Sequence, residues 1–285
     1  MAALKDIRRR IIAAKNTQKV IRAMKLVAAA RVKRAQRRAQ NARAYAAGLH
    51  GAVARVSRRL GPRAPVMWAR PKRIESLDIL VITSDRGFCG GFNENLLRLL
   101  EEGVEEHLIH NIDVTFYVVG RQGVRYLTKR GYDVDVVPTA GGSRVIASWV
   151  VSQMIGRYYE GQSAGGYVVF NRFVSAAHHE ITFWNLLPMY RHGTEQERHM
   201  EYLYEPSRSA ALDYLCVEAL ISTIHQALLE SQASELAARL MAMDAANKNS
   251  EEMIAHLTSV YHKRRQEEIT SELLDVVGGA EALLH

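Results

Sequence analysis

The fold is decided by residues 4–60, which read LKDIRRRIIAAKNTQKVIRAMKLVAAARVKRAQRRAQNARAYAAGLHGAVARVSRRL. Residues at alternating steps of three and four form a seven-residue repeat. The repeat comprises Leu4, Ile7, Ile11, Ala14, Gln18, Ile21, Lys25, Ala28, Val32, Ala35, Ala39, Ala42, Ala46, Leu49, Val53, Val56 and Leu60. Only Gln18 and Lys25 among them are polar, and the first proline is Pro62. The pattern predicts one long helix with a coiled-coil seam, roughly 85 Å in length, which is more than a domain's diameter.

The far end of the chain carries a matching repeat after Pro206, with Ser207 predicted as the helix cap. Its seam comprises Leu212, Leu215, Ala219, Ser222, Gln226, Leu229, Ala233, Leu236, Leu240, Met243, Asn247, Ser250, Ile254, Leu257 and Tyr261. Beyond Tyr261 the phase of the repeat slips, which would locally unwind a supercoil. The sequence therefore predicts a second long helix over residues 207–285.

The two helices are predicted to pair with each other. The segment between them can return the chain to the end of the first helix, so the second would run antiparallel to it. If Leu60 lies near Leu212, then Leu4 lies near Glu268 and the first helix ends there. Residues 269–285 would then extend alone for roughly 25 Å. Because they are apolar on all sides, we expect something to surround them.

Residues 77–205 change period and are predicted to form an α/β body. The predicted strands are Leu77–Thr83, Asp113–Val119, Asp133–Val137, Tyr167–Val174 and His179–Leu186. The predicted helices are Phe92–His110, Arg121–Arg130 and Ser143–Tyr159. We therefore expect a small, mostly parallel sheet flanked by helices, with a hairpin at its end. The predicted domains are the coiled-coil helix 1–62, the body 77–205 and the coiled-coil helix 207–285.

The net charge of +8 is unevenly distributed. Residues 1–73 contain a single acidic residue, Asp6, among many Lys and Arg, so a basic arm is joined to an acidic body. Such an arm suits nucleic acid, an anionic membrane face or an acidic protein partner. An RNA- or DNA-binding protein with a basic coiled-coil arm thus stays open as an alternative. It leaves the apolar end unexplained, and Tyr45 is the only aromatic residue before Trp68.

The sequence predicts no catalytic site, no cofactor site and no metal site. The glycine-rich turn after the first predicted strand lacks both the GxGxxG spacing and the Gly-Lys-Ser/Thr of a P-loop, so its glycines are interpreted as permitting a tight turn. His178 and His179 would point to opposite faces of a strand. No histidine is placed to activate Cys89 beside Asp85. A nucleotide-binding α/β enzyme is therefore not favoured.

No apolar run approaches the roughly 18 residues that span a bilayer. Lys5 and Arg8 stand where a signal peptide needs its apolar core. The two cysteines, Cys89 and Cys216, have no metal-type spacing and suit a reducing compartment. We therefore expect a soluble chain with no direct membrane span.

Three stretches of the chain resemble the gamma subunit of the rotary, proton-translocating F-type ATP synthase. They are NTQKVIRAMKLVAA at 16–29, ITSDRGFCGGFN at 82–93 and ASELAARLMAMDAANKN at 233–249. The final stretch from Arg265 to Ala280 is similar as well, so the resemblance covers the whole chain in the family's order. It implies an antiparallel coiled coil joined to an α/β body.

The resemblance also implies a function. The chain would be a central rotor shaft that stands inside a ring of alternating alpha and beta subunits, with its body next to the epsilon subunit and the membrane ring of c subunits. It would couple rotation driven by proton flow to ATP synthesis or hydrolysis without doing bond chemistry itself. The implied location is peripheral, on the cytoplasmic side of a bacterial inner membrane.

Residues that match the family's contact positions follow from the same resemblance. Met24 and Lys25 match a contact with the acidic lower lobe of beta. A second group matches positions that grip the beta loops near the upper part of the shaft: Arg265, Gln266, Thr270 and Glu272. The sequence departs from the family's pattern near this grip, where charged residues replace small ones: Arg264, Glu267 and Glu268.

Overall fold

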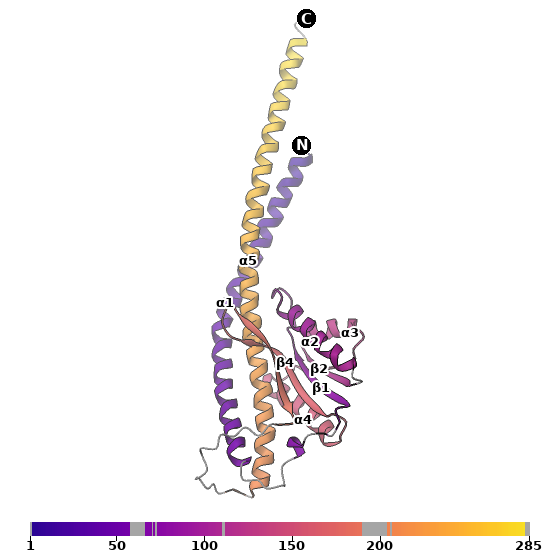
Figure 1. The fold of residues 1–285 in the computed structure, drawn as a ribbon. Helices are drawn as coiled ribbons and strands as arrows, with labels where there is room; N and C mark the ends of the chain where they lie inside the picture. The colour runs from indigo at the N-terminus through magenta and orange to yellow at the C-terminus, as the bar shows by residue number, and fades with distance from the viewer. Residues whose placement is uncertain are drawn as a thin grey trace. The chain divides into compact units, whose positions relative to one another are not determined.

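The computed structural model describes residues 2–57, 66–69, 71, 73–109, 112–189, 204–205 and 207–282. The elements in chain order are α1 (Ala2–Ser57), η1 (Val66–Trp68), β1 (Ser76–Ile82), α2 (Phe92–Ile109), β2 (Asp113–Val119), α3 (Arg121–Lys129), β3 (Val134–Val136), α4 (Ser143–Tyr159), β4 (Gly165–Phe173), β5 (His179–Leu187) and α5 (Arg208–Ala282). Figure 1 shows the course of the chain, with α1 and α5 as its two longest elements.

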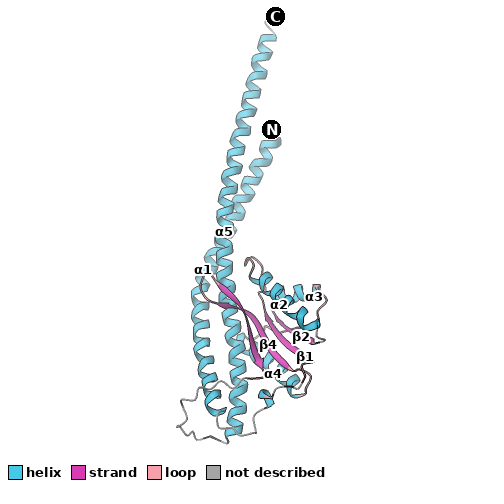
Figure 2. Cartoon of the chain, viewed as in Figure 1, coloured by secondary structure: helices cyan, strands magenta, loops and turns pink. Residues whose placement is uncertain are grey.

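Contacts divide the chain into two compact units. We call Ala30–Arg239 the sheet unit, and Met1–Ala29 together with Leu240–His285 the helix-pair unit. All five strands belong to the sheet unit, as the magenta arrows of Figure 2 show. Both long helices pass from one unit into the other. The predicted three-part division into two helices and a body stays a prediction.

The five strands form one sheet in the order β3-β2-β1-β4-β5. β1 pairs in parallel with β2 and with β4, and β2 pairs in parallel with β3. β4 and β5 are antiparallel neighbours. β1 is buried along its whole length after Ser76, as expected for a central parallel strand covered on both faces. The prediction of a mostly parallel sheet that ends in a hairpin is confirmed.

Each face of the sheet packs against its own set of helices. On one face α2 and α3 contribute Leu96, Leu97 and Leu127 to a core that includes Val81 of β1. On the other face a larger core joins the sheet to α4 and to parts of α1 and α5. Its members include Val53, Leu80, Val150, Phe170, Leu212 and Ala219. Within the sheet unit, the segments of α1 and α5 are therefore part of the core.

The predicted boundaries are close to those observed. Asp113–Val119 and Ser143–Tyr159 are confirmed at both ends, whereas the predicted strand Asp133–Val137 is the shorter β3. The backbone N–H of Ala210 donates to Ser207 Oγ at 3.2 Å, which confirms Ser207 as the cap of α5. The predicted end of the first helix, 58–62, lies outside the described residues.

α1 and α5 pair antiparallel within the sheet unit. His50 Nε2 lies 2.8 Å from Thr223 Oγ1, whereas the predicted alignment places position 50 opposite 222. Earlier in α1 the seam is made of alanines that meet alanines of α5. This cluster comprises Ala35, Ala39, Phe173, Ala233 and Ala237. Small side chains let the two helix backbones approach closely, and the whole cluster is buried.

In the helix-pair unit the two helices also run antiparallel, joined by polar side chains. Lys25 Nζ forms an ion pair with Asp244. Arg22 Nη2 lies 2.9 Å from Glu251 Oε1, and Arg22 Nε donates to Asn247 Oδ1 at 3.2 Å. The seam residues of α1 from Leu4 to Lys25 are half-buried and not buried. The predicted pairing is confirmed in both units, with different side chains.

Candidate functional site

The first pair of predicted contact residues lies where α1 meets α5. Met24 and Lys25 are both half-buried. Lys25 bridges to Asp244, whose pKa is lowered from 3.8 first by the hydrogen bond from Lys25 and then by its charge. Part of the positive charge of Lys25 is therefore balanced within the chain. Met24 has no such polar tie and contributes an adaptable apolar side chain beside it.

The second group of predicted contact residues lies on α5 near its carboxyl-terminal end. All four members are exposed: Arg265, Gln266, Thr270 and Glu272. Gln266 and Thr270 are one turn apart on one face, whereas Arg265 and Glu272 are two turns apart on another. The structure thus presents them as two faces of one helix and not as one patch.

The charged residues near this grip partly compensate one another. Arg264 Nη1 lies 3.2 Å from Glu267 Oε2, three residues along the same helix. Thr270 Oγ1 donates to the Gln266 carbonyl at 2.8 Å, so its hydroxyl is bound to the backbone of its own helix. The charged residues that depart from the family's pattern therefore leave the helix faces that carry Gln266 and Arg265 exposed.

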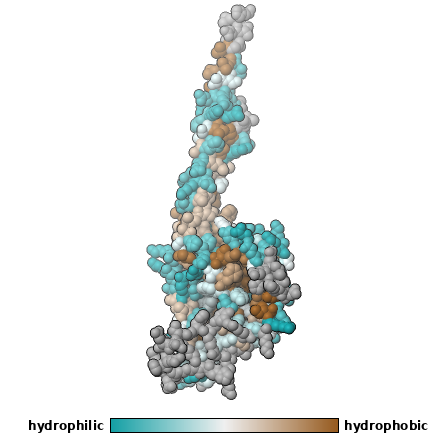
Figure 3. Space-filling view, viewed as in Figure 1, coloured by the Kyte–Doolittle hydropathy of each residue, from teal (hydrophilic) through white to brown (hydrophobic). Residues whose placement is uncertain are grey.

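The helix-pair unit carries apolar side chains on its surface. On α1 the exposed residues lie away from the seam and comprise Ile12, Val20, Leu26 and Val27. On α5 they lie near its end and comprise Ile269, Leu273, Leu274, Val276 and Val277, of which Val276 is 69% exposed. Figure 3 shows brown, apolar atoms interrupting the teal surface of this unit. Such a surface is typical of a protein interface.

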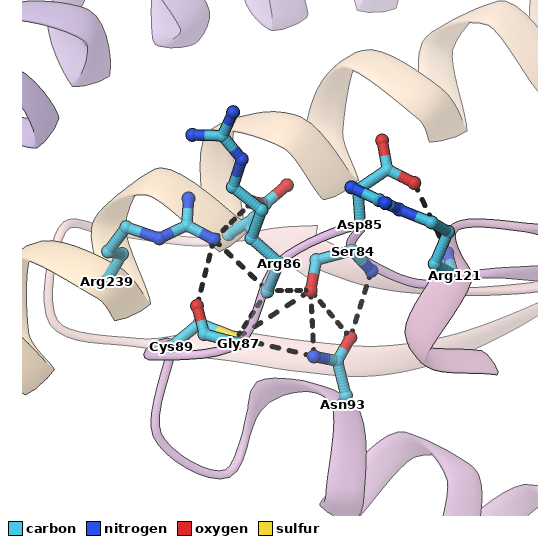
Figure 4. Close-up of polar contacts among 9 residues, drawn as sticks. Ser84, Asp85, Arg86, Gly87, Cys89, Asn93, Arg121 and Arg239 are labelled. Carbon is cyan, nitrogen blue, oxygen red and sulfur yellow. Dashed lines mark hydrogen bonds and ion pairs between the residues drawn. The ribbon is translucent and has the colours of Figure 1, made fainter. Parts of the chain in front are cut away.

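A second candidate site is the turn between β1 and α2, which is fixed by an arginine from α5. Arg239 Nη2 donates to the carbonyls of Arg86 and Gly87, at 3.3 Å in both cases. Asn93 donates to Ser84 Oγ at 2.8 Å and accepts the Ser84 backbone N–H at 3.0 Å. Figure 4 shows the Arg239 guanidinium pointing at the turn. Two of the three stretches that carry the resemblance therefore meet at this contact.

The backbone of the turn explains its residue types. Gly90 has φ 59°, a left-handed conformation that glycine adopts without strain, which confirms the prediction that a glycine permits this turn. Phe88 has φ 64° and is 72% exposed. The same turn therefore holds a bulky residue in an unfavourable backbone conformation with its side chain in solvent.

The neighbouring loop closes tightly on the end of β1. A Cβ at Gly120 would lie 2.3 Å from the Thr83 carbonyl oxygen, so only glycine fits there. Gly123 N–H donates to Thr83 Oγ1 at 2.9 Å, and Arg121 N–H donates to Asp85 Oδ1 at 3.2 Å. The Thr83 hydroxyl and the Asp85 carboxylate at this carboxyl edge of the sheet thus accept backbone N–H groups of α3 and join the end of β1 to that helix.

The described cysteines are not arranged for catalysis. Cys89 is buried, and burial raises the pKa of its thiol, an effect that a hydrogen bond with Ser84 partly opposes. Burial raises the pKa of Cys216 to about 12. Neither thiol is therefore activated as a nucleophile. Within the described ranges, no group of three or more His, Cys, Asp and Glu could hold a metal ion.

One stretch of α5 is long and apolar enough to cross a membrane by length and composition alone. However, 61% of that window is buried inside the protein. Its apolar residues pack against α1 and the sheet, where Ala219, Ile224 and Ala227 are fully buried. The composition of this helix is thus explained by its place in the core.

Comparison with known proteins gives the family. The family described as ATP synthase matches residues 3–283. The chain is 37% identical to the ATP synthase gamma chain of Geobacter sp. (strain M21), over 99% of both chains. It is 38% identical to the ATP synthase gamma chain of Geobacter metallireducens, again over 99% of both. The chain belongs to the ATP synthase gamma chain family. The resemblance predicted from the sequence is therefore confirmed.

Solved structures of the same fold extend the comparison with the gamma chain family. A chain of the Euglena gracilis mitochondrial ATP synthase, in its OSCP/F1/c-ring assembly, matches with a TM-score of 0.68 at 20% identity, covering 99% of this chain and 95% of that chain. A chain of the Tetrahymena thermophila mitochondrial ATP synthase central stalk and c-ring matches with a TM-score of 0.56 at 23% identity, covering 80% of this chain and 99% of that chain. These matches confirm the predicted fold.

Membership in the gamma chain family makes this chain a subunit of a membrane-associated ATP synthase complex. Sequence reasoning identified the helices and the turn, but it missed Arg239. The only signal for that residue was its place inside the third stretch that carries the resemblance. The roles of Met24, Lys25, Arg265, Gln266, Thr270 and Glu272 stay predictions.

Proposed function

We propose that this chain is the central rotor shaft of an F-type ATP synthase. The observation that carries the proposal is the helix-pair unit, whose two helices share a mostly half-buried seam and also expose apolar side chains outward. A two-helix coiled coil needs apolar residues only along its seam. The additional apolar residues of α1 and α5 are accounted for if other subunits surround this unit.

The surrounding subunits are proposed to be the alpha and beta subunits of the catalytic ring. The α1 segment of the helix-pair unit is strongly basic, with Asp6 as its single acidic residue, and so suits an acidic lobe of beta. Met24 and Lys25 would contact that lobe. The exposed α5 residues Gln266 and Thr270 would contact beta loops with one face, and Arg265 and Glu272 with the other.

The mechanism requires no chemistry from this chain. The two helices present different side chains in different directions, so at any angle each of three equivalent beta subunits meets a different surface. A difference in contact free energy shifts the conformational equilibrium of each subunit. A difference of about 1.4 kcal/mol in contact free energy changes a nucleotide affinity tenfold. Rotation would thus move each catalytic site through different affinities, and hydrolysis would run the cycle in reverse.

The remaining partners are proposed for the sheet unit on the basis of the same family membership. We propose contacts with the epsilon subunit and with the membrane ring of c subunits, whose rotation is driven by proton flow. The chain would be peripheral, on the cytoplasmic side of a bacterial inner membrane, without a span of its own. Nucleic acid is not a proposed partner, because an RNA-binding arm would not account for the apolar end of α5.

The test of the shaft role is a deletion in the assembled complex. Removal of residues 269–285 takes away the exposed apolar end and should leave the sheet unit folded, because that unit ends at Arg239. We expect the variant to co-purify with two larger nucleotide-binding subunits and to show weakened coupled ATP synthesis. Unchanged coupling would show that the end of α5 is dispensable. Tight binding of RNA at physiological salt would instead support the nucleic-acid alternative.

A further inference from the structure

A groove in the sheet unit lies between α3 and the edge strand β3. Its volume is about 870 Å³, and Val124 and Val136 supply its apolar part. Val136 is 61% exposed although it lies on a strand. β3 is the first strand in the sheet order, so its outer edge has no strand neighbour among the described residues. An exposed edge of this kind is available to a partner.

The rim of the groove is basic. Arg121, Arg125 and Lys129 line it, and their spacing of four residues places them on one face of α3. In the described part of the chain none of the three forms an ion pair, and Arg125 donates only to the neutral amide of Gln122, at 3.2 Å. Their charges are thus not balanced within the fold.

The neighbouring arginine shows the contrast. Arg130 forms an ion pair with Glu101 of α2, and its guanidinium carbon lies 4.9 Å from the ring centre of Tyr126. Tyr126 in turn donates to Glu101 at 2.9 Å. Arg130 is thus paired with a carboxylate of its own chain, whereas Arg121, Arg125 and Lys129 form no ion pair among the described residues. Asp85 also lines the groove and accepts the backbone N–H of Arg121, so the lining carries one carboxylate against three cations.

We propose that this groove docks an acidic amphipathic helix of a partner protein. Three cations at successive turns of α3 extend over about 12 Å, which matches carboxylates repeated at helical spacing on a facing helix. Apolar side chains between those carboxylates would cover Val124 and Val136. Exposed ion pairs contribute little alone, so the apolar contact holds the helix while the charges select its partner and register. The docking site is separate from the helix-pair unit and does not rest on the shaft role.

The test is photocrosslinking from the groove. Val136→Cys gives an attachment point for a benzophenone probe, because the native Cys89 and Cys216 are 2% and 0% exposed and do not compete for the reagent. Val174→Cys, at a residue 50% exposed, is the control attachment point. The probe is activated in the purified complex that contains the full chain, and the cross-linked peptide is sequenced by mass spectrometry.

We expect the probe attached in the Val136→Cys variant to cross-link to one protein segment that carries acidic residues at helical spacing around apolar ones. The triple variant R121E/R125E/K129E should lower the yield at least tenfold, whereas R121K/R125K should retain it because the charges remain. A matched reversal on an exposed face of α1, K33E/R34E/R37E, should leave the yield unchanged. The absence of any cross-link would overturn the proposal, as would cross-links to lipid, to nucleic acid or to a segment without acidic residues. A cross-link yield that does not change when the charges of Arg121, Arg125 and Lys129 are reversed would also overturn it.

Rotation-coupled ATP hydrolysis is measured on the same preparations. The rim variant should retain hydrolysis if the groove only docks a partner. If the groove gives no cross-link while the 269–285 deletion weakens coupling, this proposal fails and the shaft role stands. If the groove cross-links as expected while the deletion leaves coupling unchanged, the shaft role fails and this proposal stands.

Discussion

The same two helices pair in different ways in the two units. In the sheet unit, alanines and valines of α1 meet α5 in a seam that is buried and backed by the sheet. In the helix-pair unit the seam is mostly half-buried, with Ala28 and Met243 buried, and ion pairs such as Lys25 with Asp244 connect the helices. The difference shows that tight packing accompanies the part of the coil that supports the body. Polar bridges connect the helices in both units, since Arg43 pairs with Glu230 in the sheet unit, but only there do they accompany a mostly buried seam.

The largest effect that tests this comparison is expected from Arg43→Met. Arg43 lies with Nη2 3.1 Å from Glu230 Oε2, and the Glu230 side chain is fully buried. Removing the arginine leaves an uncompensated buried carboxylate, so we expect a loss of about 3 kcal/mol in the free energy of unfolding. Urea denaturation of the full chain measures it. Arg37→Met, on an exposed arginine, is the control, and equal losses in the two variants would contradict the account.

A slightly smaller effect is expected from adding volume to the seam. Ala233→Leu inserts a larger side chain into the buried alanine cluster and should lower the free energy of unfolding by about 2 kcal/mol. The same change at Ala14, a half-buried seam position of the helix-pair unit, should stay within about 0.5 kcal/mol. Thermal unfolding followed by circular dichroism compares the two. The seams do not differ in packing if both variants lose equal stability.

The contact between Arg239 and the turn should have a moderate effect. Arg239→Gln removes two charge-assisted hydrogen bonds and should cost about 1.5 kcal/mol locally. The turn would open more often, so the buried Cys89 should react about tenfold faster with a maleimide. Cys216 serves as the control within the same chain, since it is fully buried elsewhere in α5. Parallel acceleration of both cysteines would indicate general unfolding instead.

The smallest effect is expected from acid in the helix-pair unit. The pKa values of Asp244 and Glu251 are lowered from 3.8 and 4.5, first by hydrogen bonds from Lys25 and Arg22 respectively. A lowered pKa contributes stability that is present above the ordinary value and is lost as the pH falls through the folded value. The bridges should therefore weaken only below about pH 4.

A carboxyl-carbon NMR titration measures this directly. Asp244 should titrate below 3.8 in the native chain and return toward 3.8 in Lys25→Met. Glu251 should respond to Arg22→Met in the same way and remain unaffected by a control change at the exposed Lys19. A native Asp244 that titrates at or above 3.8 would show that the bridge is not formed in solution.

The sequence predicted the coil well because its signal is periodic. Every seam position of α1 from Leu4 to Val56 is buried or half-buried, since a heptad repeat specifies which side of a helix faces its partner. The bounds of the body's helices and strands were also close to the prediction, because apolar runs and glycine-rich turns mark them locally. The order of the strands was not predicted, since nothing local specifies which parallel strand lies at the edge.

The contacts that sequence reasoning missed join distant parts of the chain. Arg239 and Gly87 are 152 residues apart, and no pattern around either residue indicates that they touch. The tie from Lys25 to Asp244 was missed for the same reason, although both residues lie in stretches that carry the family resemblance. Specific side-chain pairs depend on the register between elements, which the repeat predicted only to within a few residues.

The most direct test of the rotor account is single-molecule rotation. A complex containing Val174→Cys is fixed to a surface through its catalytic ring, and a bead is attached to the new cysteine, because the native cysteines are buried. During ATP hydrolysis the account predicts sustained rotation of the bead in one direction. A bead that stays still while the same complexes hydrolyse ATP at their normal rate would contradict it.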